Sequence, residues 1–240
     1  MKKLALLFGL MALVGVAYAS EQVYFKIAVN ENDYSTFLTD RISTKKTTLQ
    51  YLATKMRQPF FNPERLNKKY YNIKVSRGIK YFDKDVVQYD ITPIFADRFR
   101  HVLMVDEIGG VVIRKEIYDT DGKLVFAFTS LDRVAQEDRP ELTKVSVGST
   151  EASYKGYYLI SDRKLKDGTK HIVFTDGLNR FSIFRQKSDI ELISEKRILY
   201  GNYIYRERVG KELFTVVGTL PFEEMERLIK NIVKLEEKPK

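Results

Sequence analysis

The sequence predicts an α+β protein that consists mostly of antiparallel β-structure and ends in one helix. Short runs in which apolar and polar residues alternate recur between Tyr70 and Val217, and this period of two is typical of half-buried strands. Turn signals such as Asp121-Gly122 separate the runs, because both residue types adopt the positive φ angles of a tight hairpin. The apolar residues after Pro221 instead recur at helical spacing, so the last element is predicted to be an amphipathic helix.

The first part of the chain is predicted to form an antiparallel meander. Val23–Val29 is the first expected strand. Lys46–Met56 fits either a short helix, because its apolar residues lie at helical spacing, or a Thr-rich strand, and periodicity does not decide between them. Further strands are expected at Asn72–Ser76, Val86–Ile91, Phe99–Val105, Val111–Tyr118 and Leu124–Val134.

The second part restarts the β pattern after a polar stretch. Residues 135–150 lose periodicity, so we place a linker at residues 138–150, between a β domain at residues 20–137 and a second domain at residues 151–240. This second domain is expected to be a small antiparallel sheet covered by the C-terminal helix. Its strands are expected at Gly156–Ser161, His171–Thr175, Phe181–Gln186, Asn202–Arg208 and Glu212–Val217.

The N-terminus has the three parts of a secretory signal peptide. Two lysines precede the apolar run Leu4–Val16, and an Ala-Tyr-Ala motif ends at Ala19, which provides the small residues that signal peptidase requires. We therefore expect residues 1–19 to be removed by cleavage between Ala19 and Ser20. The apolar run is shorter than the roughly 20 residues needed to span a bilayer. The mature protein is expected to be soluble and outside the cytoplasm.

The composition is that of a globular protein with a basic surface. The formal net charge is +9, and removal of the signal peptide lowers it by the two lysines Lys2 and Lys3. A basic surface suits nucleic acid, anionic lipid headgroups or an acidic protein. Because the chain is expected to be exported, we predict no nucleic-acid partner.

Signals for catalysis and for metal binding are missing from the sequence. The two histidines, His101 and His171, each lie inside an expected strand without a partner motif, so we interpret them as structural residues. There is no G-x-S-x-G elbow, H-E-x-x-H motif, calcium loop or phosphate-binding glycine loop. The lack of Cys also removes disulfides, thiolate catalysis and Cys-ligated zinc. We predict a protein that is not an enzyme and that uses no cofactor or metal.

The aromatic residues are concentrated on the expected strands. The chain has 15 Tyr and 15 Phe residues and no Trp. A sheet with a large apolar face and few helices to cover it must close, pair with another layer or hold a guest. These aromatics therefore either fill a core or line a hydrophobic cavity for an acyl chain. The residues expected to line such a cavity are Tyr71, Ile73, Val75, Tyr89, Phe126 and Phe128.

Several motifs follow one another in a fixed order along the chain. VQYDITP occupies Val87–Pro93, GVVIRKE occupies Gly110–Glu116 and DTDGKLVFAF occupies Asp119–Phe128. More specific are HIVFTDGLNRFSIF at His171–Phe184 and TVVGTLP at Thr215–Pro221, directly before the final helix. With these motifs the chain resembles the RseB/MucB family, periplasmic negative regulators of the sigma-E envelope stress response.

The resemblance implies a two-domain architecture. The family's N-terminal domain is similar to the lipoprotein carriers LolA and LolB, a half-open antiparallel barrel around an apolar cavity, and its C-terminal domain is a small α+β unit. Because the chain before Tyr70 offers fewer strands than that N-terminal domain has, we expect a shortened LolA-like half-barrel.

The resemblance also implies a function. Proteins of this family bind the periplasmic part of an anti-sigma factor and shield it from proteolysis, and a lipid or lipopolysaccharide signal is thought to release them. The alternative hypothesis is a periplasmic lipid or lipoprotein carrier or chaperone of the LolA type. The partner surface is expected in the most specific motif, at Asp176, Gly177, Leu178 and Phe181.

Overall fold

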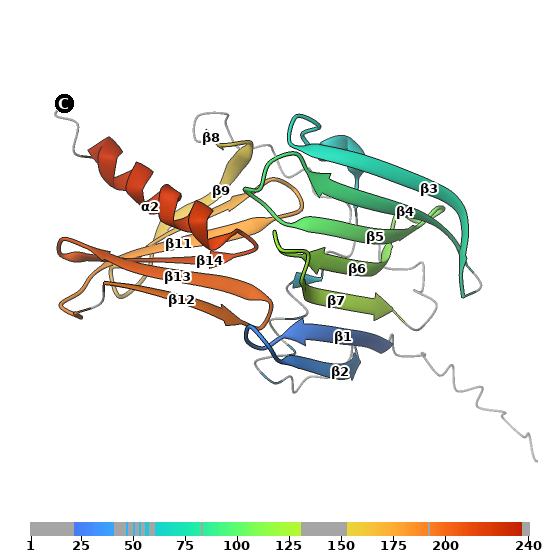
Figure 1. Cartoon of the computed structure of the whole chain (residues 1–240), viewed down its shortest axis with the longest axis horizontal. Coiled ribbons are helices and arrows are strands. Elements are labelled where there is room, and N and C mark those ends of the chain that lie inside the picture. The colour runs from blue at the N-terminus through green and yellow to red at the C-terminus, as the bar shows by residue number, and fades with distance from the viewer. Residues whose placement is uncertain are drawn as a thin grey trace, which may run out of the picture.

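Two antiparallel sheets of seven strands each lie side by side, and one helix crosses the C-terminal sheet (Figure 1). The structure is a computed structural model. It describes residues 22–40, 47, 50, 53, 56, 57, 61–82, 84–130, 153–191 and 193–236. The mostly antiparallel α+β class predicted from the sequence is confirmed. No helix among the described residues has the length and apolar character needed to cross a membrane.

The N-terminal sheet has the order β2-β1-β7-β6-β5-β4-β3. Its strands are β1 (Gln22–Ala28), β2 (Tyr34–Asp40), β3 (Tyr71–Tyr81), β4 (Lys84–Pro93), β5 (Arg100–Asp106), β6 (Val112–Tyr118) and β7 (Leu124–Ser130). All pairs between neighbours are antiparallel. Within the described ranges no ladder joins the two edge strands β2 and β3, so the sheet stays open, as expected for a half-barrel.

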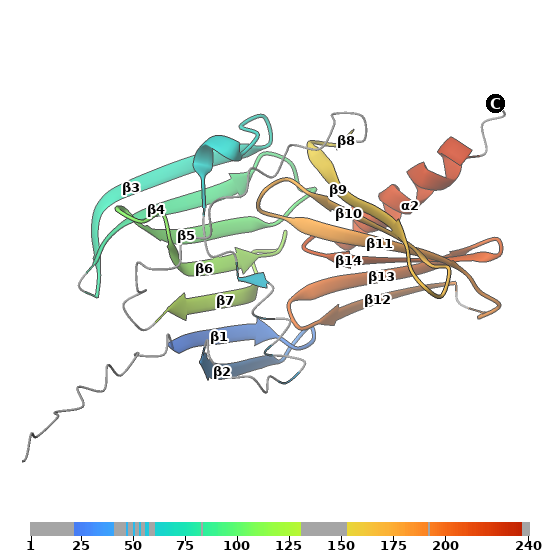
Figure 2. The same ribbon diagram turned by 180° about the vertical axis from the view of Figure 1, so that it is seen from behind.

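The C-terminal sheet has the order β12-β13-β14-β11-β10-β9-β8, and helix α2 (Phe222–Glu236) packs on one of its faces. Figure 2 shows the sheet from the side opposite to α2. Pro221 directly precedes the helix, where its missing N–H would have had no intrahelical partner. The strands are β8 (Ser153–Tyr154), β9 (Tyr157–Lys164), β10 (Lys170–Thr175), β11 (Arg180–Lys187), β12 (Ser194–Leu199), β13 (Asn202–Val209) and β14 (Glu212–Gly218).

The register of the N-terminal sheet gives it one apolar face and one polar face. Val75 pairs with Tyr89, and Phe25 pairs with Phe128. Because paired residues point to the same face and alternate residues share it, all six expected cavity residues lie on one face, which we call the inner face. The outer face carries cross-strand ion pairs such as Arg100–Asp90 at 2.6 Å.

Residues from the segment before β3 cover part of the inner face. Ala53, Phe61 and Leu66 are buried in the same cluster as the strand residues. Ala53 is helical, like Gln50 and Met56, which favours the helix over the Thr-rich strand in this segment. The 3-10 helix η1 (Pro63–Arg65) follows, and its first turn is capped by the Asn62 side chain, which accepts from the Glu64 N–H at 2.9 Å.

Some elements differ from the sequence predictions. Strands β2 and β12 were not anticipated, and β3 runs to Tyr81 because a bulge between Ser76 and Ile79, with Gly78 at φ +69°, lets it continue. The expected cleavage site at Ala19 and Ser20, the linker at residues 138–150 and the end of the strand expected at Leu124–Val134 lie outside the described residues.

Candidate functional site

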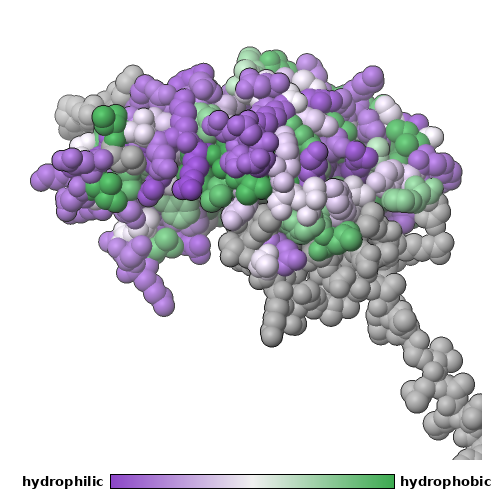
Figure 3. Space-filling model, turned by 60° about the horizontal axis from the view of Figure 1, so that its bottom comes forward, coloured by the Kyte–Doolittle hydropathy of each residue, from purple (hydrophilic) through white to green (hydrophobic). Residues whose placement is uncertain are grey.

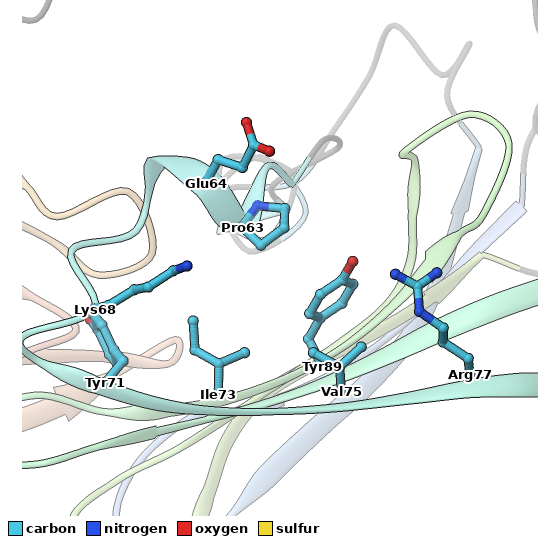
Figure 4. Close-up of a pocket in the computed structure, with 8 residues that line it drawn as sticks. All are labelled: Pro63, Glu64, Lys68, Tyr71, Ile73, Val75, Arg77 and Tyr89. Atoms are coloured by element: carbon cyan, nitrogen blue, oxygen red, sulfur yellow. The ribbon is translucent and has the colours of Figure 1, made fainter.

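A pocket of about 420 Å³ opens on the inner face of the N-terminal sheet. Its floor is made by Ile73 and Val75 of β3 and Tyr89 of β4, and Pro63 and Glu64 of η1 lie across the opening (Figure 4). The floor is apolar because these residues alternate onto the inner face. The volume falls in the range of small-molecule sites, which are mostly apolar with a few placed polar groups.

Charged side chains stand at the two ends of this pocket. Lys68 lies at one end and Arg77 at the other (Figure 4). Arg77 also pairs with Glu107 at 3.1 Å, and both side chains are largely exposed. An apolar floor between two cations suits an acyl chain with an anionic headgroup better than a neutral polar ligand.

The structure divides the six expected cavity residues into two groups. Tyr71, Ile73, Val75 and Tyr89 line the pocket. Phe126 and Phe128 are fully buried and pack against Phe25, with ring centroids 6.1 Å apart in each case. Arg57 lies over the Phe128 ring at 5.3 Å from its centroid, and Phe61 packs on Tyr89 with ring centroids 5.1 Å apart, whereas the pocket stays open beside Ile73 and Val75.

A second cluster, at the contact between the two sheets, is centred on Arg98. Arg98 precedes β5, and its side chain is completely buried. Its guanidinium donates to both carboxylate oxygens of Asp97, at 2.8 and 3.2 Å, and to Asp176 Oδ2 at 3.1 Å. It also donates to the carbonyl oxygen of Lys155 at 2.8 Å. Arg98 therefore joins the N-terminal sheet to two turns of the C-terminal sheet.

Aromatic rings enclose this guanidinium. The centroids of Tyr70 and Tyr157 lie 4.3 and 4.8 Å from Arg98 Cζ, within the range of cation–π attraction. Gly156 allows the Tyr70 ring to lie against the backbone of the turn between β8 and β9, because a Cβ at this position would lie 2.3 Å from the ring. Its φ of +81° also favours glycine.

Asp176 accepts hydrogen bonds from both sheets. The Tyr71 hydroxyl donates to Asp176 Oδ2, and the backbone N–H groups of Leu178 and Asn179 donate to Oδ1 at 3.0 and 2.7 Å. The Asn179 side chain continues the network, because its Nδ2 donates to the Tyr71 hydroxyl at 2.9 Å. We call the whole network the junction: Tyr71, Asp97, Arg98, His101, Asp176 and Asn179.

Two ionisable groups of the N-terminal sheet lie buried next to Asn179 and Asp176. His101 Nε2 is 3.0 Å from Asn179 Oδ1, and burial together with the charge of Lys115 lowers the pKa of His101 to about 3. Burial lowers the pKa of Lys115 to about 8, and the charge of Asp176 opposes this shift. His101 is therefore neutral at physiological pH, so the Nε2–H donates to Asn179 Oδ1, whose amide hydrogens point to Tyr71.

The predicted partner surface is not an exposed surface in this structure. Asp176, Leu178 and Phe181 are 3%, 7% and 1% exposed, and Gly177 is half-buried. They are buried because the turn between β10 and β11 inserts between the sheets, where Asp176 enters the junction. Leu178 belongs to the same apolar cluster as the inner face. Any partner that contacts this motif must reach it from the space between the sheets.

Sequence reasoning missed Arg98 as a structural residue of the junction and Lys115 as a buried residue near it. One available signal was the charged pair Asp97-Arg98 next to the apolar strand that ends at Val105, because a charge pair beside a buried strand is unusual. Nothing comparable marks Lys115. Within the described ranges no three His, Asp or Glu residues are grouped as a metal site would require.

Among the described residues on the face that Figure 3 shows, hydrophilic ones predominate and hydrophobic ones are scattered among them. Two sites of the molecule have a geometry that suits binding or structural coupling. One is an apolar pocket with cationic ends, and the other is a buried polar network between two sheets.

Comparisons with known proteins agree with this architecture. Residues 142–233 match the family model of the MucB/RseB C-terminal domain. The sigma-E factor regulatory protein RseB of Haemophilus influenzae is 23% identical over 159 residues, which cover 56% of this chain and 50% of the relative. The chain thus aligns with about half the length of that relative.

Solved structures show the same fold over most of the chain. MucB in the Pseudomonas aeruginosa MucA/MucB complex aligns with a TM-score of 0.57 at 18% identity, covering 87% of this chain and 90% of MucB. A structure titled MucB in complex with MucA(peri) gives the same TM-score at 17% identity, covering 87% and 90%. MucB alone gives 0.57 at 17% identity, covering 87% and 89%. Residues 142–233 thus match the MucB/RseB C-terminal domain, and the chain shares its two-sheet fold with MucB.

Proposed function

We propose that this protein is a periplasmic regulatory protein that binds the periplasmic part of an anti-sigma factor and has no catalytic role. The observation that carries the proposal is the family match of residues 142–233. It is supported by the shared two-sheet fold with MucB, which has been solved in complex with MucA(peri).

The proposed mechanism is steric. The junction holds the two sheets together through a buried ion pair and several buried hydrogen bonds, so the protein presents one preorganised surface to a partner. Covering the protease-sensitive segment of the anti-sigma factor protects it from cleavage. A lipid or lipopolysaccharide ligand that binds more tightly to the partner-free form releases the complex, because a ligand shifts an equilibrium only through its differential affinity.

The protein is exported and has two domains under this proposal. Residues 1–19 act as the signal peptide, cleaved between Ala19 and Ser20, and the mature chain works in the periplasm. A domain at residues 20–137, a linker at 138–150 and a domain at 151–240 fit the two sheets, whose described strands span residues 22–130 and 153–218.

Co-purification tests the proposed partner. The mature chain is expected to form a complex at micromolar concentrations with the periplasmic domain of an anti-sigma factor from the same organism, measured by size-exclusion chromatography and calorimetry. The complex is also expected to slow cleavage of that domain by a site-1 protease. A mature protein that folds but forms no complex at these concentrations would contradict the proposal.

A second function is favoured by the pocket over β3 and β4. An apolar floor with Lys68 and Arg77 at its ends would accept an acyl chain and its anionic headgroup. Such a ligand would serve either as the release signal or as the cargo of a LolA-type carrier. Mass spectrometry of lipids extracted from gently purified protein shows whether a specific lipid is bound. Protein that is consistently empty would argue against this second function.

Replacing Ile73 with glutamate is expected to weaken binding of a fluorescent fatty acid at least about tenfold, because an unpaired carboxylate on the apolar floor is costly to desolvate. The matched control is Asn72→Glu, since Asn72 is exposed on the opposite face of the same strand. Equal binding by both variants, titrated by fluorescence, would rule out the pocket as the fatty-acid site.

A further inference from the structure

A groove of about 740 Å³ separates β6 of the N-terminal sheet from the C-terminal sheet. One wall is the face of the C-terminal sheet that α2 leaves uncovered. Tyr203 packs on Phe222 of α2, so the residues that pair in its row, Gly218 and Phe181, share the face that α2 covers. The adjacent pair Ser182 and Val217 therefore points to the opposite face, into the groove. The other wall includes Lys115 and Ile117 of β6.

The charged residues that line this groove are all cationic. Arg163, Arg180, Lys115 and Arg57 lie on its walls, and none of the lining residues described by the structure is Asp or Glu. Arg163 and Arg180 are exposed, and no described carboxylate forms an ion pair with either. Their charges are therefore free to act on a ligand, in a concave site where charges of one sign concentrate the field.

The two exposed arginines are placed at a defined spacing along the strands. Arg163 pairs with His171, which pairs with Phe184, so the three side chains form one row across β9, β10 and β11. Arg180 pairs with Thr175, four residues further along β10 on the same face. Four strand residues correspond to roughly 13 Å, and the step of two strands from β9 to β11 adds roughly 10 Å across the sheet, so the two arginine Cα atoms lie roughly 16 Å apart.

Apolar and uncharged residues fill the interval between the two arginines. Phe184 stacks on His171, with centroids 4.3 Å apart and an interplanar angle of 4°. Ser182 of β11 follows toward Arg180, and Val217 of β14 pairs with Ser182 on the side away from β9. This wall therefore carries Arg163 at one end, an apolar stretch around Phe184 in the middle and Arg180 at the other end.

We propose that this groove binds an extended acidic segment of a protein partner, with carboxylates at positions i and i+4 and an apolar residue between them. In an extended segment, residues i, i+2 and i+4 face the same side, and i to i+4 spans roughly 13 Å. The long glutamate and arginine side chains cover the remaining distance of roughly 3 Å. The two carboxylates reach Arg163 and Arg180, and the apolar side chain lies over β10 and β11, beside Phe184. Gly177 and Leu178 also line the groove. The inference rests on the proposed function, because it assigns this segment to the anti-sigma factor.

Fluorescence anisotropy with defined peptides tests the groove itself. The probe is a fluorescein-labelled peptide of repeated Glu-Ser-Leu-Ser units, and the comparison peptide repeats Lys-Ser-Leu-Ser. The acidic peptide is expected to bind and the basic one not to bind. In the double variant Arg163→Glu, Arg180→Glu, binding is expected to weaken at least about tenfold. The control Lys187→Glu, Lys211→Glu reverses two exposed charges outside the groove and is expected to change it less than about twofold.

Each other outcome overturns the proposal. No binding of the acidic peptide, or the same loss in both double variants, excludes a specific acidic-segment site. Binding of phosphatidylglycerol vesicles that depends on the two arginines, without peptide binding, would make the groove a lipid-headgroup site.

The anti-sigma factor's periplasmic domain provides the second readout. If it binds the wild-type chain and the Arg163→Glu, Arg180→Glu variant equally well, the groove inference fails while the proposed function stands. If it binds neither protein, the proposed function fails, and the peptide result still decides whether the groove takes an acidic segment.

Discussion

Replacing Arg98 with methionine is expected to lower the free energy of unfolding by about 3–5 kcal/mol, because it leaves Asp97 and Asp176 buried without their cation. Since Arg98 also bonds the Lys155 carbonyl, the loss falls on the contact between the sheets. Urea denaturation followed by fluorescence and circular dichroism measures the loss. We expect the two sheets of the variant to unfold in separate transitions if the wild-type chain unfolds in one.

The matched control is Arg98→Lys. Lysine keeps the charge but lacks the planar fork that reaches Asp97 and Asp176 together, and it stacks less well between Tyr70 and Tyr157. The free energy of unfolding of Arg98→Lys is expected to fall by less than that of Arg98→Met, but by a measurable amount. Unfolding free energies of all three proteins that agree within error would mean that the junction does not stabilise the fold.

Acid is expected to destabilise the protein through His101. Its pKa is about 3 in the folded chain because of burial and the charge of Lys115, against an ordinary value of 6.5. Between these values the unfolded chain binds a proton that the folded chain does not, so the free energy of unfolding falls as the pH falls through this window. At about 1.4 kcal/mol for each pH unit, the loss reaches about 4 kcal/mol near pH 3.

The variant His101→Gln isolates this contribution. Glutamine keeps an N–H donor for Asn179 Oδ1 but does not titrate, so the pH dependence of its stability between pH 6.5 and 3 is expected to be shallower than that of the wild type. Urea midpoints at several pH values measure the slope. His171→Gln is the control, because His171 is partly exposed and lies outside the junction. Parallel pH profiles for wild type and His101→Gln would contradict the assignment.

Much of the fold was predictable because strand alternation and turn residues are local signals. The strands near Val23, Phe99 and Leu124, the Asp121-Gly122 turn and the helix after Pro221 were all expected and are present. Strand β12 was missed because half of its sequence SEKRIL is charged, as suits an edge strand exposed to solvent. Strand β2 was missed although turn residues precede it, because the apolar residues of YSTFLTD do not alternate regularly with polar ones.

The sites were less predictable because they depend on what covers a face. Alternation placed Ile73 and Phe126 on the same face correctly, but it could not show that covering residues such as Ala53 leave one accessible and bury the other. The junction was unreadable for a different reason. Arg98 and Asp176 are 78 residues apart and meet only because two sheets dock, and no periodicity in the sequence encodes that docking.

The burial of Lys115 gives the protein an internal chemical reporter. Its side chain is 2% exposed and its pKa is about 8, so near pH 8 a large fraction of this amine is neutral and nucleophilic, yet shielded from reagents. Any event that separates the sheets would open it to acylation. Peptide mass mapping after brief treatment with an amine-reactive ester would therefore reveal, at one residue, whether a partner or a lipid closes or opens the molecule.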